Sequence, residues 1–217
     1  MADQRFTIRE ERANAISHLT GAVLATGGLV LMVVFSAIRA DAWAVVSTAI
    51  FGSVMIMLYL SSTFTHWLSA GKAKELFFTF DQVAIFLMIA ATYTPLALTV
   101  LRGPVGWVIF GLEWGLAVTG ITIKLFRPSP FAKGVSTFYI VLYVLMGWLL
   151  LIAIVPLARN MHLMGLGWIL TGGLFYTLGI LFYKKSKFPY HHLVWHLMVI
   201  AGSISHFIAV FFYIINR

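Results

Sequence analysis

Residues 43–68 read WAVVSTAIFGSVMIMLYLSSTFTHWL, a run without a single aspartate, glutamate, lysine or arginine. A transmembrane helix needs about 20 mostly apolar residues, whereas a strand of a transmembrane barrel takes about 9–11. This run is therefore long enough for a helix that crosses a bilayer and too long for a barrel strand. It decides the fold because the same pattern recurs along the chain.

Comparable apolar runs follow one another along the sequence, separated by short polar or turn-forming breaks. Examples of such breaks are Arg102-Gly-Pro104 and Lys184-Lys-Ser-Lys187. The sequence predicts an all-α integral membrane protein: a seven-transmembrane helix bundle over residues 14–217, preceded by a short N-terminal segment, residues 1–13. The expected spans are 14–38, 43–68, 77–100, 105–125, 135–157, 164–183 and 191–215.

The composition excludes several classes of protein. Of the 217 residues, 61% are hydrophobic and 10% are charged, whereas a soluble domain is about 45–50% apolar and about 25% charged. A chain of this length folded in water would bury only about 70–75% of its surface, which leaves much apolar surface facing solvent. A soluble globular enzyme, a disordered chain and a nucleic-acid-binding module are therefore excluded, and membrane lipids are the expected surroundings. Cysteine is absent, which excludes disulfides and thiolate metal sites.

The net charge of +8 is explained by the orientation of the helices. Cytoplasmic loops of membrane proteins carry an excess of lysine and arginine. With the N-terminus placed inside, 11 of the 15 basic residues fall on the inner side. We therefore predict a cytoplasmic N-terminus, including the segment 1–13, and a C-terminus outside. The inner basic residues are Arg5, Arg9, Arg12, Lys72, Lys74, Lys124, Arg127, Lys133, Lys184, Lys185 and Lys187.

Ionisable side chains within the spans are few, and such groups are costly in a membrane and typically functional. Following the chain back and forth across the bilayer places His18, His66, Asp81, His192 and His196 near the same face. At 1.5 Å of rise per residue, this polar layer lies within about 10 Å of the inner boundary. Four different helices contribute to it, and nothing in the order of the sequence requires that agreement.

The spacing within this layer suggests a metal site. His192 and His196 are four residues apart and project from one helix face, and a third histidine from another helix would complete a three-histidine set. Three neutral imidazoles plus a water form the open arrangement of catalytic zinc. Asp81 would orient the water and take its proton. A histidine pair near a helix end is ordinarily an interfacial feature. Here, however, His66, Ser62 and Asp81 are expected at the same depth as the pair, which favours a metal site.

Other polar residues receive different interpretations. His191 faces about 100° away from the pair and is expected to be an interfacial residue. His206 lies about 15 Å deeper than His196 and is expected to be a hydrogen-bonded bundle residue. Glu113 lies near the middle of its span and is assigned no role. Glu11 is interpreted as part of a solvated helix start with a favourable acidic first turn.

Two features bear on packing. Pro95 removes one backbone hydrogen bond from the span 77–100 and is expected to kink it. The spacing Gly111-x-x-x-Gly115 and the pair Gly172-Gly173 predict close helix packing.

Several motifs, taken together, resemble the progestin and adipoQ receptor family in its bacterial hemolysin III-like branch. The resemblance covers nearly the whole chain, and its most specific part is the order Ser-x-x-x-His, Asp, His-x-x-x-His on three helices. The same trio also marks the superfamily that includes alkaline ceramidases. The matching motifs are Glu11-x-x-Asn14-x-x-x-His18, Ser62-x-x-x-His66, Asp81, Thr92-Tyr-Thr-Pro95, Gly172-Gly-Leu-Phe-Tyr176 and His192-x-x-x-His196.

The resemblance implies seven helices, a cytoplasmic N-terminus and a zinc ion held on the cytoplasmic side by His66, His192 and His196. It implies that Asp81 contacts the zinc through water and that Ser62 lies beside the site. It also implies a multi-pass protein of the bacterial plasma (inner) membrane with a role in membrane homeostasis. The chain lacks the long cytoplasmic N-terminal region of the hormone receptors, which argues against receptor-type signalling through a large partner.

Three functions remain open at this point. The first is a zinc-dependent intramembrane hydrolase of a lipid amide or ester, with Asp81 as general base and Ser62 as a hydrogen-bond donor to the developing oxyanion. The second is a non-enzymatic sensor or receptor-like regulator of membrane state, with zinc as a structural clamp. The third is a pore-forming hemolysin, which a single polar layer fits least. The oligomeric state is left open.

Overall fold

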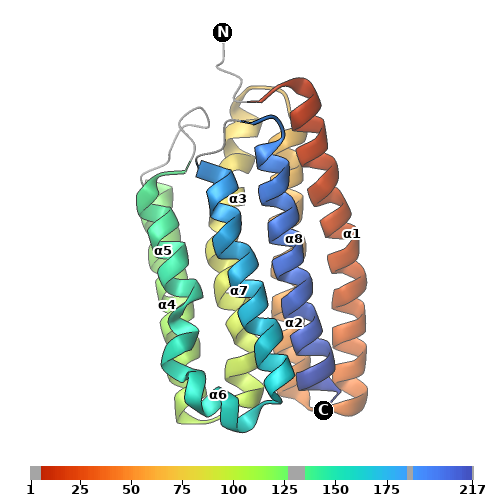
Figure 1. The fold of residues 1–217 in the computed structure, drawn as a ribbon, viewed down its shortest axis with the longest axis vertical. Helices are drawn as coiled ribbons and strands as arrows, with labels where there is room; N and C mark the ends of the chain where they lie inside the picture. The colour runs from red at the N-terminus through yellow and green to blue at the C-terminus, as the bar shows by residue number, and fades with distance from the viewer. Residues whose placement is uncertain (1–5, 127–134, 185–187, 217) are drawn as a thin grey trace.

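The structure, a computed structural model, describes residues 6–126, 135–184 and 188–216. In this part of the chain, long helices run side by side in one bundle (Figure 1). The start of α1 and the end of α8 lie at opposite ends of the bundle. The helices are α1 (Ile8–Arg39), α2 (Ala42–Trp67), α3 (Lys72–Pro95), η1 (Leu96–Val100), α4 (Pro104–Phe126), α5 (Thr137–Gly147), η3 (Leu149–Ala153), α6 (Ile154–Asn160), α7 (Leu163–Lys184), α8 (His191–Val210) and η4 (Phe211–Ile215).

Among the described residues, seven helical segments are long and apolar enough to cross a membrane, which confirms the predicted seven-helix membrane fold. Three of them are composite: α3 continues into η1, α8 continues into η4, and α5, η3 and α6 together form the span Thr137–Asn160. The first helix begins at Ile8, before the expected start of the span at residue 14. The cause is a capping box, in which Thr7 and Glu10 satisfy each other's backbone N–H groups.

The third span changes its helix type at Pro95, where the sequence predicts a kink. The α-helix ends at this proline, and Leu96–Val100 forms a π-helix closed by a hydrogen bond of 2.9 Å from Leu101 N to Leu96 O. Proline lacks a backbone N–H and crowds the preceding turn, so an irregular turn beside it is expected.

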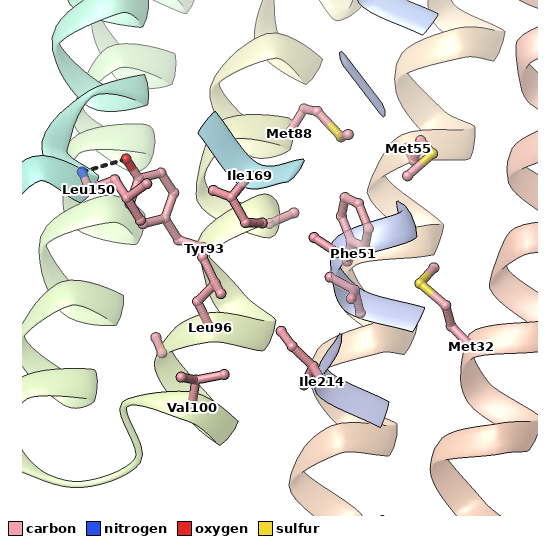
Figure 2. Close-up of a cluster of buried hydrophobic side chains, with 14 of the residues drawn as sticks. Met32, Phe51, Met55, Met88, Tyr93, Leu96, Val100, Leu150, Ile169 and Ile214 are labelled. Atoms are coloured by element: carbon pink, nitrogen blue, oxygen red, sulfur yellow. Dashed lines mark hydrogen bonds between the residues drawn. The ribbon is translucent and has the colours of Figure 1, made fainter. Parts of the chain in front are cut away.

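The fifth span has a break that the sequence did not predict. Helix α5 ends at Gly147, and the chain continues as a 3₁₀-helix from Leu149. The Tyr93 hydroxyl satisfies the backbone groups at this break: it accepts from Leu150 N at 2.8 Å and donates to Gly147 O at 2.8 Å. The bond to Leu150 is drawn in Figure 2. A side chain on α3 thus supports the change of helix type in a neighbouring span.

Glycine permits close packing at one of the predicted places. A Cβ added at Gly172 would collide with the His206 ring and approach Gly202 O to 3.0 Å. At Gly173 the nearest atom would be in Trp148, 4.0 Å away. At Gly111 and Gly115 a Cβ would meet no described atom within 4 Å. Close packing is therefore confirmed at Gly172, where α7 meets α8, and the prediction is wrong for Gly111 and Gly115.

The apolar core occupies the middle of the bundle. Met32, Phe51, Met88 and Ile214 are buried there and come from four different helices (Figure 2). Side chains that are exposed in the protein are largely apolar as well, as a lipid-facing surface requires. Four buried histidines, His18, His66, His192 and His196, lie toward the end of the bundle where α1 begins.

Candidate metal centre

Helices α2 and α8 bring three histidines together. One ring nitrogen from each of His66, His192 and His196 lies within 4.8 Å of the other two, and all three residues are buried. Their ring centroids are 4.6 to 5.0 Å apart. In a tetrahedral zinc site with Zn–N bonds of about 2.0–2.1 Å, ligand nitrogens are about 3.4 Å apart. The three nitrogens therefore need to approach one another by about 1.4 Å at most to share one ion.

The helical spacing explains this convergence. His192 and His196 are one turn apart in the first half of α8, and His66 lies in the last turn of α2. His191 does not belong to this cluster. Its Nδ1 instead donates to Phe182 O at 2.8 Å. Its separation from the pair agrees with the sequence-based expectation.

A carboxylate fixes the proton on the His66 ring. His66 Nδ1 lies 2.5 Å from Glu11 Oε2. An ionised carboxylate only accepts hydrogen bonds, so Nδ1 carries the hydrogen and Nε2 presents its lone pair. Metal-binding histidines typically show this arrangement, in which the second ring nitrogen donates to a carboxylate or carbonyl.

The His196 ring is fixed in the same tautomer by other groups of α1. Its Nδ1 lies 3.1 Å from Asn14 O and 3.0 Å from Ser17 Oγ. The Ser17 hydroxyl donates its own hydrogen to Asn14 O at 2.7 Å, so His196 Nδ1 must be a donor and Nε2 is left for a ligand. Two of the three histidines are therefore held ready to bind a metal through Nε2, and this donor set fits zinc.

A fourth imidazole lies against this set without belonging to it. His18 stacks on His196 with ring centroids 3.6 Å apart and planes 9° apart. His18 is 4% exposed, and neither of its ring nitrogens has a hydrogen-bond partner among the described residues. Gln82, 1% exposed, has an equally unpartnered side-chain amide. Buried polar atoms normally have partners, so these two side chains point to water or a ligand.

His18 and Gln82 line a cavity of about 170 Å³ that also contains the three clustered histidines in its wall. One water needs about 10–15 Å³ of such space, so the cavity has room for a sizeable group. Ser62 and Asp81 also line it, and the Ser62 hydroxyl is within hydrogen-bonding reach of the Asp81 carboxylate. Farther along the bundle the wall is mainly apolar, with Met88, Leu96, Leu150 and Ile169 as examples.

The structure thus brings all five predicted site residues to one cavity. His66, His192 and His196 form the cluster of potential ligands, while Asp81 lies in the wall outside that cluster. His206 is also in the wall, and its Nδ1 donates to Gly202 O at 2.9 Å, which confirms the expected hydrogen-bonded bundle residue.

The interpretation of Glu11 as part of a solvated helix end is wrong. Its side chain is 15% exposed and binds both His66 and Lys74. Lys74, counted from the sequence as a loop charge, is buried. The available signal was the spacing of Glu11, Asn14 and His18, which lie on one helix face.

Glu113 is fully buried, and its carboxyl oxygens have no partner within the described ranges. It lies outside the cavity wall.

Comparisons with known proteins agree with this architecture. A family model described as "Haemolysin-III related" matches residues 6–207. The chain is 40% identical to Hemolysin-3 of Bacillus cereus, over 96% of this chain and 93% of that protein. It is 41% identical to the Hemolysin-3 homolog of Bacillus subtilis (strain 168), over 97% of each.

A more distant relative is human. The chain is 29% identical to the monocyte to macrophage differentiation factor of Homo sapiens, over 96% of this chain and 86% of that protein. The resemblance drawn from the sequence motifs is confirmed by these matches. Because the family model and both bacterial relatives cover almost the whole chain, the protein belongs to the haemolysin-III-related family.

Proposed function

We propose that this protein is a zinc-dependent intramembrane hydrolase that cleaves an amide or ester bond of a membrane lipid and serves membrane homeostasis. One observation carries the proposal: three buried histidines converge in the wall of a cavity that also contains Asp81 and Ser62. Nitrogen donors without thiolates, beside a carboxylate outside the ligand cluster, are typical of catalytic zinc sites.

The residues of the chain divide the chemistry as follows. His66, His192 and His196 would hold the ion through ring nitrogens, and a bound zinc ion supplies Lewis acidity toward a carbonyl and an activated water. Asp81 takes a proton from the water as its oxygen attacks the carbonyl carbon. When the C–N or C–O bond breaks, Asp81 returns that proton to the departing amine or alcohol. Ser62 orients the Asp81 carboxylate or donates to the developing oxyanion.

The cavity favours an acyl chain as the bound part of the substrate. Its deeper wall is mainly apolar, whereas the polar groups are near the three histidines. Neither lysine nor arginine is among its described lining residues, so a phosphate group would have no cationic partner there. The unpartnered side chains of His18 and Gln82 suit the uncharged polar part of a lipid, next to the bond that is cleaved.

The location follows from the distribution of charge. With the N-terminus in the cytoplasm, as the excess of basic residues on that side favours, the histidine cluster lies toward the cytoplasmic face of the bacterial plasma membrane. This places the site near the level where lipid head groups join their acyl chains.

Metal analysis combined with a lipid-turnover assay tests the proposal. The purified wild type is expected to carry about one zinc per chain, and His66→Ala and His192→Ala are expected to lose it. Asp81→Asn is expected to keep the metal and lose hydrolysis, while His191→Ala, beside the cluster, retains both. A wild type that binds zinc but releases no fatty acid from any lipid amide or ester would contradict the hydrolase.

A sensor with structural zinc is the second candidate, and one observation favours it. The potential ligands come from α2 and α8, so a single ion would clamp the second span to the last one. In that case, metal removal changes stability and signalling, and no lipid product forms.

A pore is the weakest candidate, because the potential ligands lie together at one end of the bundle instead of along its length. Ion flux that survives chelation would revive the pore.

A further inference from the structure

Helix α1 contributes no member of the three-histidine cluster, yet it contacts the cluster at several points. Glu11 binds the His66 ring, the backbone of Asn14 and the hydroxyl of Ser17 lie at His196 Nδ1, and His18 stacks on His196. These α1 residues lie along one side of its first three turns, as their spacing requires. The helix therefore orients rings that α2 and α8 provide.

Glu11 makes the strongest of these contacts. One carboxylate oxygen, Oε2, is 2.5 Å from His66 Nδ1, and the other, Oε1, is 2.8 Å from Lys74 Nζ. The side chains of Glu11, His66 and Lys74 are 15%, 2% and 9% exposed, so all three are largely shielded from solvent. The carboxylate thus links α1 to the end of α2 and the beginning of α3.

We propose that Glu11 is a positioning residue for the metal, and that Lys74 holds Glu11 in place. This inference rests on the metal site of the proposed function. The carboxylate holds the His66 ring through Nδ1 and so assigns metal binding to Nε2, as second partners of metal-bound histidines do.

Lys74 adds a further effect. Because Lys74 occupies Oε1 and His66 occupies Oε2, both Glu11 oxygens are engaged. The carboxylate is therefore fixed in orientation and stays at His66 Nδ1, on the side of the ring opposite the nitrogen that would bind the metal.

Glu10 offers a matched control next to this residue. Its Oε2 accepts from Thr7 N at 2.9 Å, and its Oε1 accepts from Tyr190 N at 2.9 Å. It therefore caps α1 and ties it to the start of α8, and among the described residues its carboxylate makes no hydrogen bond with the three histidine rings. Replacing Glu10 tests the effect of losing an acidic side chain at the same end of α1.

The decisive measurement is metal affinity, by titration of the chelator-treated full-length protein in detergent with Co²⁺ or Zn²⁺ against a competing chelator. Glu11→Gln keeps the size of the side chain but loses its charge, and is expected to weaken binding about 10- to 100-fold. Glu10→Gln is expected to bind like the wild type. Lys74→Met is expected to weaken binding less than Glu11→Gln does, because the carboxylate keeps its bond to His66 and loses only the partner that fixes Oε1.

A double variant separates positioning from general damage to the fold. The two histidines left in His66→Ala are expected to bind Co²⁺ weakly at high concentration. In that background, Glu11→Gln is expected to cause no further loss of this residual affinity, since its effect passes through the missing ring. Equal affinity of the wild type and Glu11→Gln would overturn the proposal, as would a full additional loss in the His66→Ala background. A wild type that binds no metal overturns both this proposal and the zinc site. If the wild type binds metal without hydrolysing lipid, the proposed hydrolase activity is contradicted and the positioning role of Glu11 is not.

Discussion

The His18 ring lies flat on the His196 ring, with centroids 3.6 Å apart and planes 9° apart. His196 is also held at Nδ1 by Asn14 O and Ser17 Oγ. The ring is therefore restrained both in its plane and across its face. His18 itself has no hydrogen-bond partner among the described residues, although both of its nitrogens are buried.

This relationship predicts a separation of metal binding from turnover. His18→Phe keeps a flat ring on His196 but removes the two nitrogens, so zinc content is expected to stay at the wild-type level. Lipid turnover is expected to fall roughly 2- to 10-fold, the effect of one lost hydrogen bond to the substrate. His191→Phe, a change outside the cavity wall, is the control. Unchanged turnover in His18→Phe would show that this imidazole does not contact the substrate.

Metal removal is expected to lower the thermal stability of the wild type. An ion that binds only the folded protein stabilises it by about 2.7 kcal/mol at 100 times its dissociation constant. A chelator should therefore reduce the unfolding temperature of the wild type in detergent and leave that of His192→Ala unchanged. Identical melting curves for the wild type with and without chelator would contradict a bound metal.

The two neighbouring glycines of α7 are expected to respond differently to alanine. Gly172→Ala places a methyl group against the His206 ring and Gly202 O, and overpacking of this kind costs about 1–3 kcal/mol. Gly173→Ala meets only Trp148, at 4.0 Å, and is expected to be neutral or slightly stabilising. Denaturant titration of the two purified variants checks the difference, and equal stabilities would contradict the close packing of α7 on α8.

Tyr93→Phe is expected to destabilise the bundle without changing its metal affinity. The lost hydroxyl bridges Leu150 N and Gly147 O where the fifth span changes its helix type. A buried backbone group left without a partner costs about 1–3 kcal/mol. Thermal unfolding should reveal this loss, and a Tyr93→Phe protein as stable as the wild type would show that other groups satisfy the break.

The spans were predictable from the sequence because each is a long apolar run that needs no knowledge of its neighbours. The irregular turn after Pro95 was predictable for the same reason, since proline acts on its own helix. The break after Gly147 was not, because the groups that stabilise it include Tyr93, which is remote in sequence. Local patterns therefore predict the helices and the irregularity at Pro95, whereas the break after Gly147 depends on a contact between helices.

The candidate site shows the same division. The common depth of His66, His192 and His196 follows from helix direction and residue rise, which the sequence provides. Their convergence around one point depends on how the helices pack. The contacts of Glu11 do not follow from the sequence either, because an acidic residue in the first turn of a helix is ordinarily explained by the helix dipole. Its contact with His66 depends on how α1 packs against α2, and its contact with Lys74 depends on where α3 begins.

The separation of the three histidines along the chain has a consequence for biosynthesis. His66 lies in the second span, whereas His192 and His196 lie in the last one. A chain still being synthesised therefore holds only one of the three until its final helix has entered the membrane. Metal loading would then mark completed assembly, and a chain truncated before α8 should remain free of stoichiometric zinc even when its earlier helices are correctly inserted.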